Sequence, residues 1–304
     1  MPERFSAFSF VDRITALDDG RRARGRFAIP SGLPAFSIGL VAEAVGQLAA
    51  WVAMAQAEFR RRPVAALSGE TRIVGEAAPG AILDLGVEIE SCDQDAVAYG
   101  GWARVADTPV LELSRCVGPM LPLEDFDAPD AVRGDFETLR GSGKPPSRFP
   151  GITAPDLSLI DHIPGQRLRA SMYIPVSAPF FADHFPRRPV FPATLLLDAH
   201  IRLALQLAGE ALPAGQRLWP ARVADVKMRS FILPGHTVEI EAAMRSATDG
   251  MAELTLAATV DGKRVATGRM EIVSREPETS RSTARGATAL PGCPERRGVW
   301  GARG

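Results

Sequence analysis

The sequence predicts an α+β protein made of two tandem copies of one unit, in which a curved antiparallel sheet wraps around a single long apolar helix. The first observation behind this prediction is a repeated opening segment. Residues Phe8–Ile14 correspond to Leu157–Ile163 in the second half, and each is followed by a polar turn containing glycine and an alternating basic segment. Both segments read as the first hairpin of a unit.

The second observation is a conserved spacing within the two halves. Pro79 lies 36 residues after Glu43, and Pro234 lies 36 residues after Asp198. In both places the proline is followed by glycine and then by an alternating strand. Repeats of this length, with one helix followed by several strands, predict two similar domains rather than a solenoid.

The elements of each unit follow from periodicity. The run Ile38–Met54 is apolar on nearly every face, which predicts a buried central helix, and it is too short for a comfortable membrane span. In the second half, Thr237–Ala242, Met251–Val260 and Lys263–Ile272 alternate as strands, and Asp261-Gly262 forms a hairpin turn between the last two. Each unit therefore has one helix and roughly five antiparallel strands.

Composition shifts predict the domain boundaries. Residues 1–122 form the first unit and residues 151–274 the second. Residues 123–150 are rich in turn formers and charge, which predicts a linker that acts as a flexible strap. Residues 275–304 lack periodicity and predict a disordered tail.

Charge and cysteine content narrow the function classes. The 304 residues carry a formal net charge of −1, so no general attraction to nucleic acid is expected. The three cysteines are odd in number and lack metal-site spacing, so we expect a reducing compartment and neither a metal site nor a disulfide framework. No cofactor is expected either. The start has no signal-peptide core, which favours a cytoplasmic protein without a membrane span.

The chemistry-bearing residues are divided between the copies. In the second half, His184-Phe185-Pro186 opens a proline-rich turn, and Asp198 follows on a helix 14 residues after the histidine. The first half carries Glu43 and Gln47 on its helix but has no histidine before it. The first copy is shorter by six residues in the stretch where His184 stands in the second. One copy retains a base and the other an acid.

These residues resemble the 3-hydroxyacyl-acyl-carrier-protein dehydratases, whose units have the hotdog fold. The resemblance spans about 245 of the 304 residues, and the block from His184 to Asp198 is its specific part. It implies an α+β double hotdog in which the two copies pair within one chain, with further homo-oligomerisation possible. In that family each active site takes its histidine from one unit and its acid from the other. We therefore expect His184 to meet Glu43, with Gln47 one turn away.

The two helix acids are expected to differ. Asp198 and Arg202 stand at i and i+4, so we expect an ion pair that lowers the pKa of Asp198 and leaves it as a degenerate, structural second site. Glu43 has apolar neighbours and no basic residue one turn away. Desolvation is then expected to keep Glu43 protonated near neutral pH, as a general acid requires.

The resemblance also implies a mechanism and a substrate site. His184 would remove the proton α to a thioester carbonyl while Glu43 protonates the departing β-hydroxyl group. The N–H of Ala193, after Pro192 at the first helical position, would polarise the carbonyl. The family usually has glycine where Ala193 stands, so an extra methyl group lies near the thioester. Phe185 would line the same site.

Two arginines beside the histidine suggest the partner. Arg187 and Arg188 would attract an acidic acyl carrier protein or the phosphate of its pantetheine arm. The triple run Arg60–Arg62 could do the same, although ordinary solvated arginines explain it equally well. His162, His200 and His236 are expected to be structural or exposed.

Three function classes compete. The first is a dehydratase that converts a carrier-bound 3-hydroxyacyl thioester to the trans-2-enoyl thioester in fatty-acid or polyketide-type synthesis. The second is another hotdog enzyme. A thioesterase would not require His184, and an enoyl-thioester hydratase would normally show Asp-x-Asn-Pro where this chain has Phe181-Ala182-Asp183. The third is a non-catalytic acyl-binding scaffold in a synthase assembly.

Overall fold

In a computed structural model, the chain is described for residue 5 and for residues 7–145 and 149–275. The first unit contains β1 (Arg13–Asp18), β2 (Arg22–Ala28), α1 (Ile38–Gln56), β3 (Arg61–Pro63), β4 (Leu67–Ile73), β5 (Ile82–Cys92), β6 (Ala96–Val105) and β7 (Thr108–Pro122). The second unit contains β8 (Ser158–Ile163), β9 (Arg167–Tyr173), a short 3-10 helix η2 (Pro179–Ala182), α3 (Ala193–Ala211), β10 (Arg217–Met228), β11 (Thr237–Thr248), β12 (Met251–Val260) and β13 (Lys263–Arg275).

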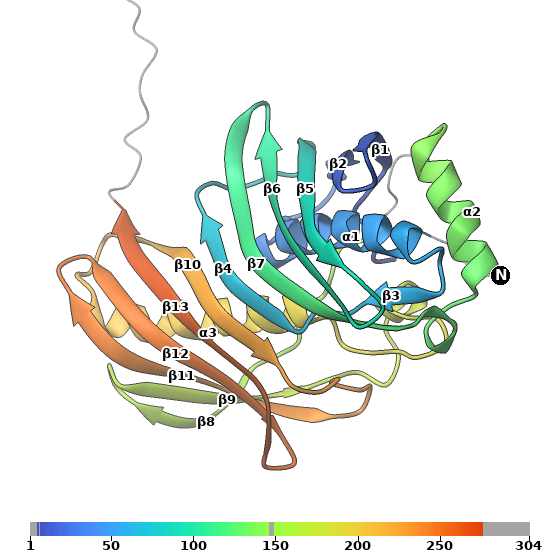
Figure 1. Cartoon of the computed structure of the whole chain (residues 1–304). Helices are drawn as coiled ribbons and strands as arrows, with labels where there is room; N and C mark the ends of the chain where they lie inside the picture. Colours follow the sequence, from blue (N-terminus) through green and yellow to red (C-terminus); the bar gives the residue numbers. More distant parts are fainter. Residues whose placement is uncertain (1–4, 6, 146–148, 276–304) are drawn as a thin grey trace, which may run out of the picture.

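Within the described residues, the strands form one continuous antiparallel sheet (Figure 1). Its order is β1-β2-β5-β6-β7-β4-β10-β13-β12-β11-β9-β8, with β3 beside β7. Read inward from its two ends, this order gives the same unit twice. The predicted α+β double hotdog is confirmed, and each Pro-Gly pair lies just before β5 or β11 as expected.

Each central helix is enclosed by the sheet of its own unit (Figure 1). Helix α1 is long and apolar enough to cross a membrane by composition alone, but 67% of its most apolar window is buried inside the protein. It begins at the N-cap Ser37, whose side chain accepts a hydrogen bond from the N–H of Leu40. Its apolar character on nearly every side is explained because α1 packs on β5 and β6 and also contacts α3.

The two units join where β4 pairs with β10. Thr71 lies opposite Val223 and Ser68 opposite Val226. The main-chain hydrogen-bond ladder therefore continues from one unit to the other across this β4–β10 pair, which we call the seam. Trp219 on β10 adds a buried bond, because its indole N–H donates to the carbonyl of Ile73 at 3.0 Å. The seam is thus an internal part of a sheet and not a loose contact between domains.

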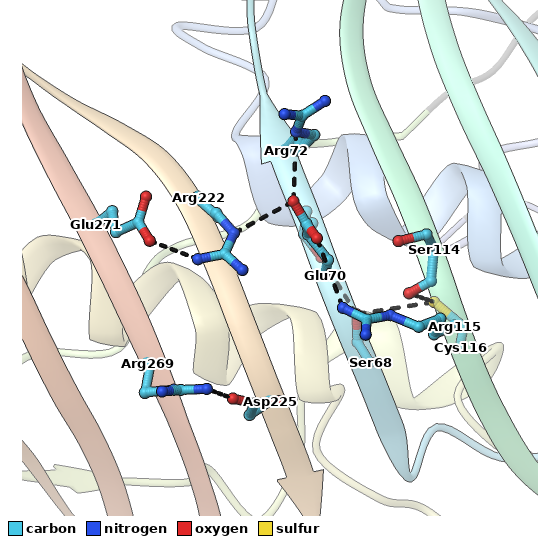
Figure 2. A network of polar contacts seen from close by, with 11 residues as sticks. Ser68, Glu70, Arg72, Ser114, Arg115, Cys116, Arg222, Asp225, Arg269 and Glu271 are labelled. Atoms are coloured by element: carbon cyan, nitrogen blue, oxygen red, sulfur yellow. Dashed lines mark hydrogen bonds and ion pairs between the residues drawn. The ribbon is translucent and has the colours of Figure 1, made fainter.

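Charged side chains bridge the seam as well (Figure 2). Glu70 on β4 contacts Arg222 of β10 at 3.2 Å and also Arg72 and Arg115 of its own unit. Arg222 in turn pairs with Glu271 on β13, and Arg269 pairs with Asp225 nearby. These pairs are partly exposed, so each stabilises the fold only modestly.

The predicted flexible strap is wrong over much of its length. Residues 123–125 form the 3-10 helix η1 (Leu123–Asp125), and Pro129–Arg140 form a helix, α2, that packs against the first unit. Phe136 of α2 contacts the rings of Trp51 and Phe59. Val132, Phe136 and Leu139 are spaced at i, i+4 and i+7, which is the apolar stripe of an amphipathic helix. Of the predicted tail, Arg275 ends β13 and residues 276–304 lie outside the described residues.

The seam yields a stability prediction. Trp219→Phe removes a buried donor and leaves the carbonyl of Ile73 without that bond, so the free energy of unfolding should fall by about 1–3 kcal/mol. Urea unfolding followed by circular dichroism measures the change. Trp102→Phe, which alters a half-buried ring beneath Arg104, is the control and should cost less. Equal losses from the two substitutions would contradict a specific role for the seam bond.

Candidate active site

A cavity of about 920 Å³ lies where the two units meet. Its lining includes both residues predicted to act on protons, His184 of the second unit and Glu43 of the first. Four of the predicted substrate-contacting residues line it too: Gln47, Phe185, Arg188 and Ala193. The structure thus brings the surviving acid and the surviving base of the two copies to one space.

His184 follows η2 and is fixed by a closed turn. The Val190 N–H donates to the carbonyl of His184 at 3.1 Å, and the His184 Nδ1 lies 3.0 Å from the Val190 carbonyl oxygen. Because a carbonyl oxygen only accepts, the proton of the neutral imidazole resides on Nδ1. Nε2 is then left with its lone pair, as a base requires.

The His184 ring is packed between aromatic neighbours. The ring of Phe185, joined to it through a cis peptide bond, stacks at 4.1 Å between centroids, and Phe8 approaches edge-on at 5.5 Å. Burial lowers the pKa of His184, the charge of Glu43 acts in the opposite direction, and the charge of Arg62 lowers the pKa further. The imidazole is therefore held in its neutral form to a lower pH than in water.

Both carboxylate oxygens of Glu43 accept hydrogen bonds. Gln47, one turn along α1, donates from Nε2 to Oε1 at 3.0 Å. Thr194, in the first turn of α3, donates from Oγ1 to Oε2 at 2.7 Å. Sequence reasoning missed Thr194, whose position in the first helical turn after Pro192 was its only signal.

Asp198 is held at the start of α1, much as Glu43 is held at the start of α3. The expected ion pair with Arg202 and the expected lowering of the pKa of Asp198 are both wrong. Its Oδ1 accepts the Gly39 N–H at 2.9 Å and its Oδ2 accepts the Ser37 hydroxyl at 2.5 Å, both at the start of α1. Arg202 instead donates to the carbonyl of Pro155 at 3.0 Å. Burial raises the pKa of Asp198 to about 6, against the lowering effect of the bonds from Ser37 and Gly39 and the charge of Arg202.

The two central helices touch at their first turns. A side chain on Gly39 would place a Cβ atom 2.6 Å from Asp198 Oδ1 and in collision with the carbonyl oxygen of Thr194. Only glycine lets α1 and α3 approach this closely. The same approach brings Thr194 within reach of Glu43 and Gly39 within reach of Asp198.

The segment before β1, residues 7–12, is hydrogen-bonded to residues beside both the acid and the base. Asp183, next to His184, accepts the N–H groups of Ala7 at 2.9 Å and Phe8 at 2.8 Å. Gln47 accepts the Phe10 N–H at 2.8 Å and donates to the Phe8 carbonyl at 3.0 Å. One short stretch of chain is therefore bonded to the neighbour of each catalytic candidate. No motif in the sequence indicates this role.

A buried lysine from the linker anchors that segment. The Lys144 side chain is only 3% exposed; its ammonium group donates to the Ser9 carbonyl at 2.9 Å and lies 3.4 Å from Asp12 Oδ1. Asp12 Oδ2 accepts the Ala28 N–H, so the pair also fixes the entry to β1. Burial lowers the pKa of Lys144 and raises that of Asp12.

The remaining predicted substrate residues fall into three groups. Ala193 is the first residue of α3, so its N–H has no acceptor within the helix. Pro192 was expected at the first helical position, but it is the N-cap, one residue earlier. Arg187 does not line the cavity; it donates to the Glu124 carbonyl at 2.8 Å. Arg188 lies over the ring of Phe231 at 4.9 Å.

Arg62 is a further cavity residue. Its guanidinium lies 3.9 Å from the centroid of the Phe185 ring, which places a positive charge beside His184. Sequence reasoning treated the triple arginine run as equally well explained by solvation. Its members differ: Arg61 donates to the Met120 carbonyl, whereas Arg62 faces the cavity.

The other histidines have structural partners, as expected. His162 pairs with Glu210, buried His200 lies 3.0 Å from the Ala257 carbonyl, and His236 Nδ1 is 3.2 Å from the Leu233 N–H. Within residues 7–145 and 149–275 no group of three or more histidine, cysteine or acidic residues is placed to hold a metal ion.

The family model and the similar proteins each match less than half of the chain. The FabA-like domain family matches residues 156–269, which lie in the second unit. The 3-hydroxyacyl-[acyl-carrier-protein] dehydratase FabZ of Yersinia enterocolitica is 30% identical over 139 residues, covering 44% of this chain and 81% of that protein. The corresponding protein of Myxococcus xanthus is 29% identical over 144 residues, covering 46% of this chain and 93% of that protein.

Among solved structures, more than four fifths of the chain is similar to hotdog-fold proteins. The tesB protein of Mycobacterium avium subspecies paratuberculosis has a TM-score of 0.53 at 12% identity, covering 86% of this chain and 96% of that one. The 12:0-ACP thioesterase of Umbellularia californica has a TM-score of 0.52 at 11% identity, covering 84% and 94%. At these identities the likeness establishes the fold alone.

The linker lysine yields a prediction. Lys144→Met leaves Asp12 buried without its counter-charge, so the free energy of unfolding should fall by about 3–5 kcal/mol. Adding Asp12→Asn should recover part of that loss, as measured by urea unfolding. Lys227→Met, which removes an exposed lysine, is the matched control and should change little. Strictly additive losses in the double variant would contradict a coupled pair.

Asp198 yields a pH prediction. Because its pKa is about 6 in the fold and 3.8 ordinarily, its favourable contribution is complete below pH 3.8 and is lost as the pH rises through 6. Asp198→Asn keeps a neutral side chain at every pH. As the pH rises from 3.8 to above 6, the free energy of unfolding of the variant should therefore increase by about 1–3 kcal/mol relative to that of the unsubstituted protein. Thermal unfolding across this range measures the difference, and a constant difference would show that Asp198 is not destabilised by ionisation.

Proposed function

The chain belongs to the family of 3-hydroxyacyl-acyl-carrier-protein dehydratases, and we propose that it removes water from a 3-hydroxyacyl thioester on an acyl carrier protein to give the trans-2-enoyl thioester. It would do so as a cytoplasmic hydro-lyase in fatty-acid or polyketide-type synthesis. The observation that carries this proposal is that His184 and Glu43, from different copies, line one cavity. Each is held there by its own hydrogen bonds.

The proposed reaction begins at the carbon α to the thioester carbonyl. His184 Nε2, the nitrogen without the proton, takes the α-hydrogen as H⁺. The electron pair left behind forms the new double bond as the bond between the β-carbon and its oxygen breaks. Charge that builds on the thioester oxygen is met by the N–H of Ala193 at the positive end of α3.

Glu43 completes the elimination by giving a proton to the departing oxygen, which leaves as water. The Thr194 hydroxyl can donate to the carboxylate and accept from the carboxylic acid, so it can hold Glu43 in both states. The imidazolium and the carboxylate that remain are reset by proton exchange with solvent. Gln47 fixes the other oxygen and ties it to the segment before β1.

The proposal assigns one active centre to each chain. Asp198 occupies the place in the second copy that Glu43 occupies in the first, but no histidine precedes α1 in the sequence. Its carboxylate is bonded to Ser37 and Gly39 at the start of that helix. We therefore infer a structural role for Asp198.

The carrier protein is the proposed partner. Arg62 and Arg188 line the cavity, and Arg187 is exposed beside it. Guanidinium groups at this position suit the phosphate of a pantetheine arm and the acidic surface of its carrier.

Substitution of the acid and the base tests the proposal. His184→Ala and Glu43→Gln should each lower kcat/KM by about 10²–10⁴ for loss of water from a 3-hydroxyacyl carrier protein, followed by mass spectrometry. Asp198→Asn is the matched control on the equivalent helix and should retain most activity. Release of free acid would indicate a thioesterase, an unchanged substrate a scaffold, and equal loss from all three variants would exclude the asymmetric site.

The pH profile gives an independent test. Because His184 must be neutral and its pKa is lowered, the acidic limb of kcat/KM should have its midpoint below 6.5. Arg62→Gln removes a charge that lowers this pKa, so the variant's midpoint should move upward. A midpoint at or above 6.5 in the unsubstituted protein would contradict the assigned environment of the base.

A further inference from the structure

A row of polar side chains crosses the cavity wall formed by the first unit's sheet. Ser68 on β4 lies opposite Cys116 on β7, and Cys116 lies opposite Tyr99 on β6. All three line the cavity, as does Thr71 on β4. The strand register therefore places three hydroxyl groups and a thiol together, a pattern that no single stretch of the sequence reveals.

This row lies close to the proposed acid. A Cβ atom on Gly46, one turn beyond Glu43 on α1, would be 3.6 Å from the Tyr99 hydroxyl. The cavity follows α1 past this point, where Ala50 and Met54 also line it. A thioester with its carbonyl at Ala193 and its β-oxygen at Glu43 would therefore continue along α1. The next carbons of the acyl chain would then meet the row.

The hydrogen-bonding capacity of the row is only weakly used within the protein. Ser68 Oγ and Thr71 Oγ1 are 3.3 Å apart, the Cys116 thiol donates to Ser68 Oγ at 3.7 Å, and the Tyr99 hydroxyl is hydrogen-bonded to Cys116. A hydroxyl group can donate once and accept twice, and sulfur is a poor partner. Burial raises the pKa of both Tyr99 and Cys116, so the row stays neutral.

A saturated alkyl chain is a poor occupant for this wall. It would displace water from the hydroxyl groups and offer no hydrogen bond in return, which is costly for polar groups that the chain would bury. An oxygen substituent on the chain would replace the displaced water. Sites that hydrogen-bond a substrate oxygen discriminate strongly against analogues that lack it.

We propose that the acyl chain accepted here carries a hydroxyl or keto oxygen beyond its β-carbon, bound by Tyr99 and Ser68. This inference rests on the proposed dehydratase function and names its substrate class. It favours polyketide-type acyl chains over fully saturated fatty-acyl chains.

Paired substrates test the inference. The full chain is given carrier-bound 3-hydroxyhexanoyl and 3,5-dihydroxyhexanoyl thioesters, and water loss is followed by mass spectrometry. We expect kcat/KM to be at least about tenfold higher for the dihydroxy substrate. The double substitution Tyr99→Phe with Ser68→Ala should reduce this ratio about tenfold. Leu113→Met, an apolar change on the same wall, should leave the ratio unchanged.

The outcomes separate this inference from the function on which it rests. Turnover of both substrates with equal kcat/KM would overturn the substrate class and leave the dehydratase intact. A ratio that survives Tyr99→Phe with Ser68→Ala would overturn the assignment to this row. Turnover of neither substrate would overturn the proposed function and the inference together.

Discussion

The structure depends on the reciprocal contact between its two central helices. The carboxylate in the second turn of each helix is held by the start of the other helix: Glu43 by Thr194, and Asp198 by Ser37 and Gly39. The contact is possible because residue 39 is glycine. It fixes how far each unit can slide along the other, and so it sets which side chains the shared cavity receives.

Around that contact the pseudo-symmetry is broken in a consistent way. In the first unit, Glu43 faces a cavity that His184 also lines. In the second unit, the carboxylate of Asp198 is bonded to the N-terminus of α1. The segment before β1 adds to the difference, because it bonds to Asp183 and Gln47 and is itself anchored by Lys144 from the linker. The geometry of the candidate site thus draws on both units and on the segment that joins them.

Much of this arrangement could be predicted from sequence because it depends on local patterns. Helical and strand periodicities, the Pro-Gly spacing and the division of His184 and Glu43 between copies can all be read directly from the sequence.

The environment of Asp198 could not be predicted in this way. Spacing within α3 suggested Arg202 as its partner, but the carboxylate turns towards α1, and contacts between helices leave no periodic signal. Which of the arginines line the cavity could not be predicted for a similar reason, since an arginine's neighbours in space decide whether it faces the cavity, as Arg62 does, or a carbonyl, as Arg187 does. Helix α2 was hidden by the prolines and glycines on either side of its short apolar stripe.

The pairing of β4 with β10 has a consequence for how the molecule behaves on dilution. In an assembly of separate hotdog subunits, the encounter of base and acid is governed by mass action and weakens as the protein becomes scarce. Here the two halves are tethered through α2 and share one ladder of main-chain bonds, so their effective concentration is set by the tether. The shared cavity is consequently complete in a single molecule, and each half is free to diverge because it always meets the same partner.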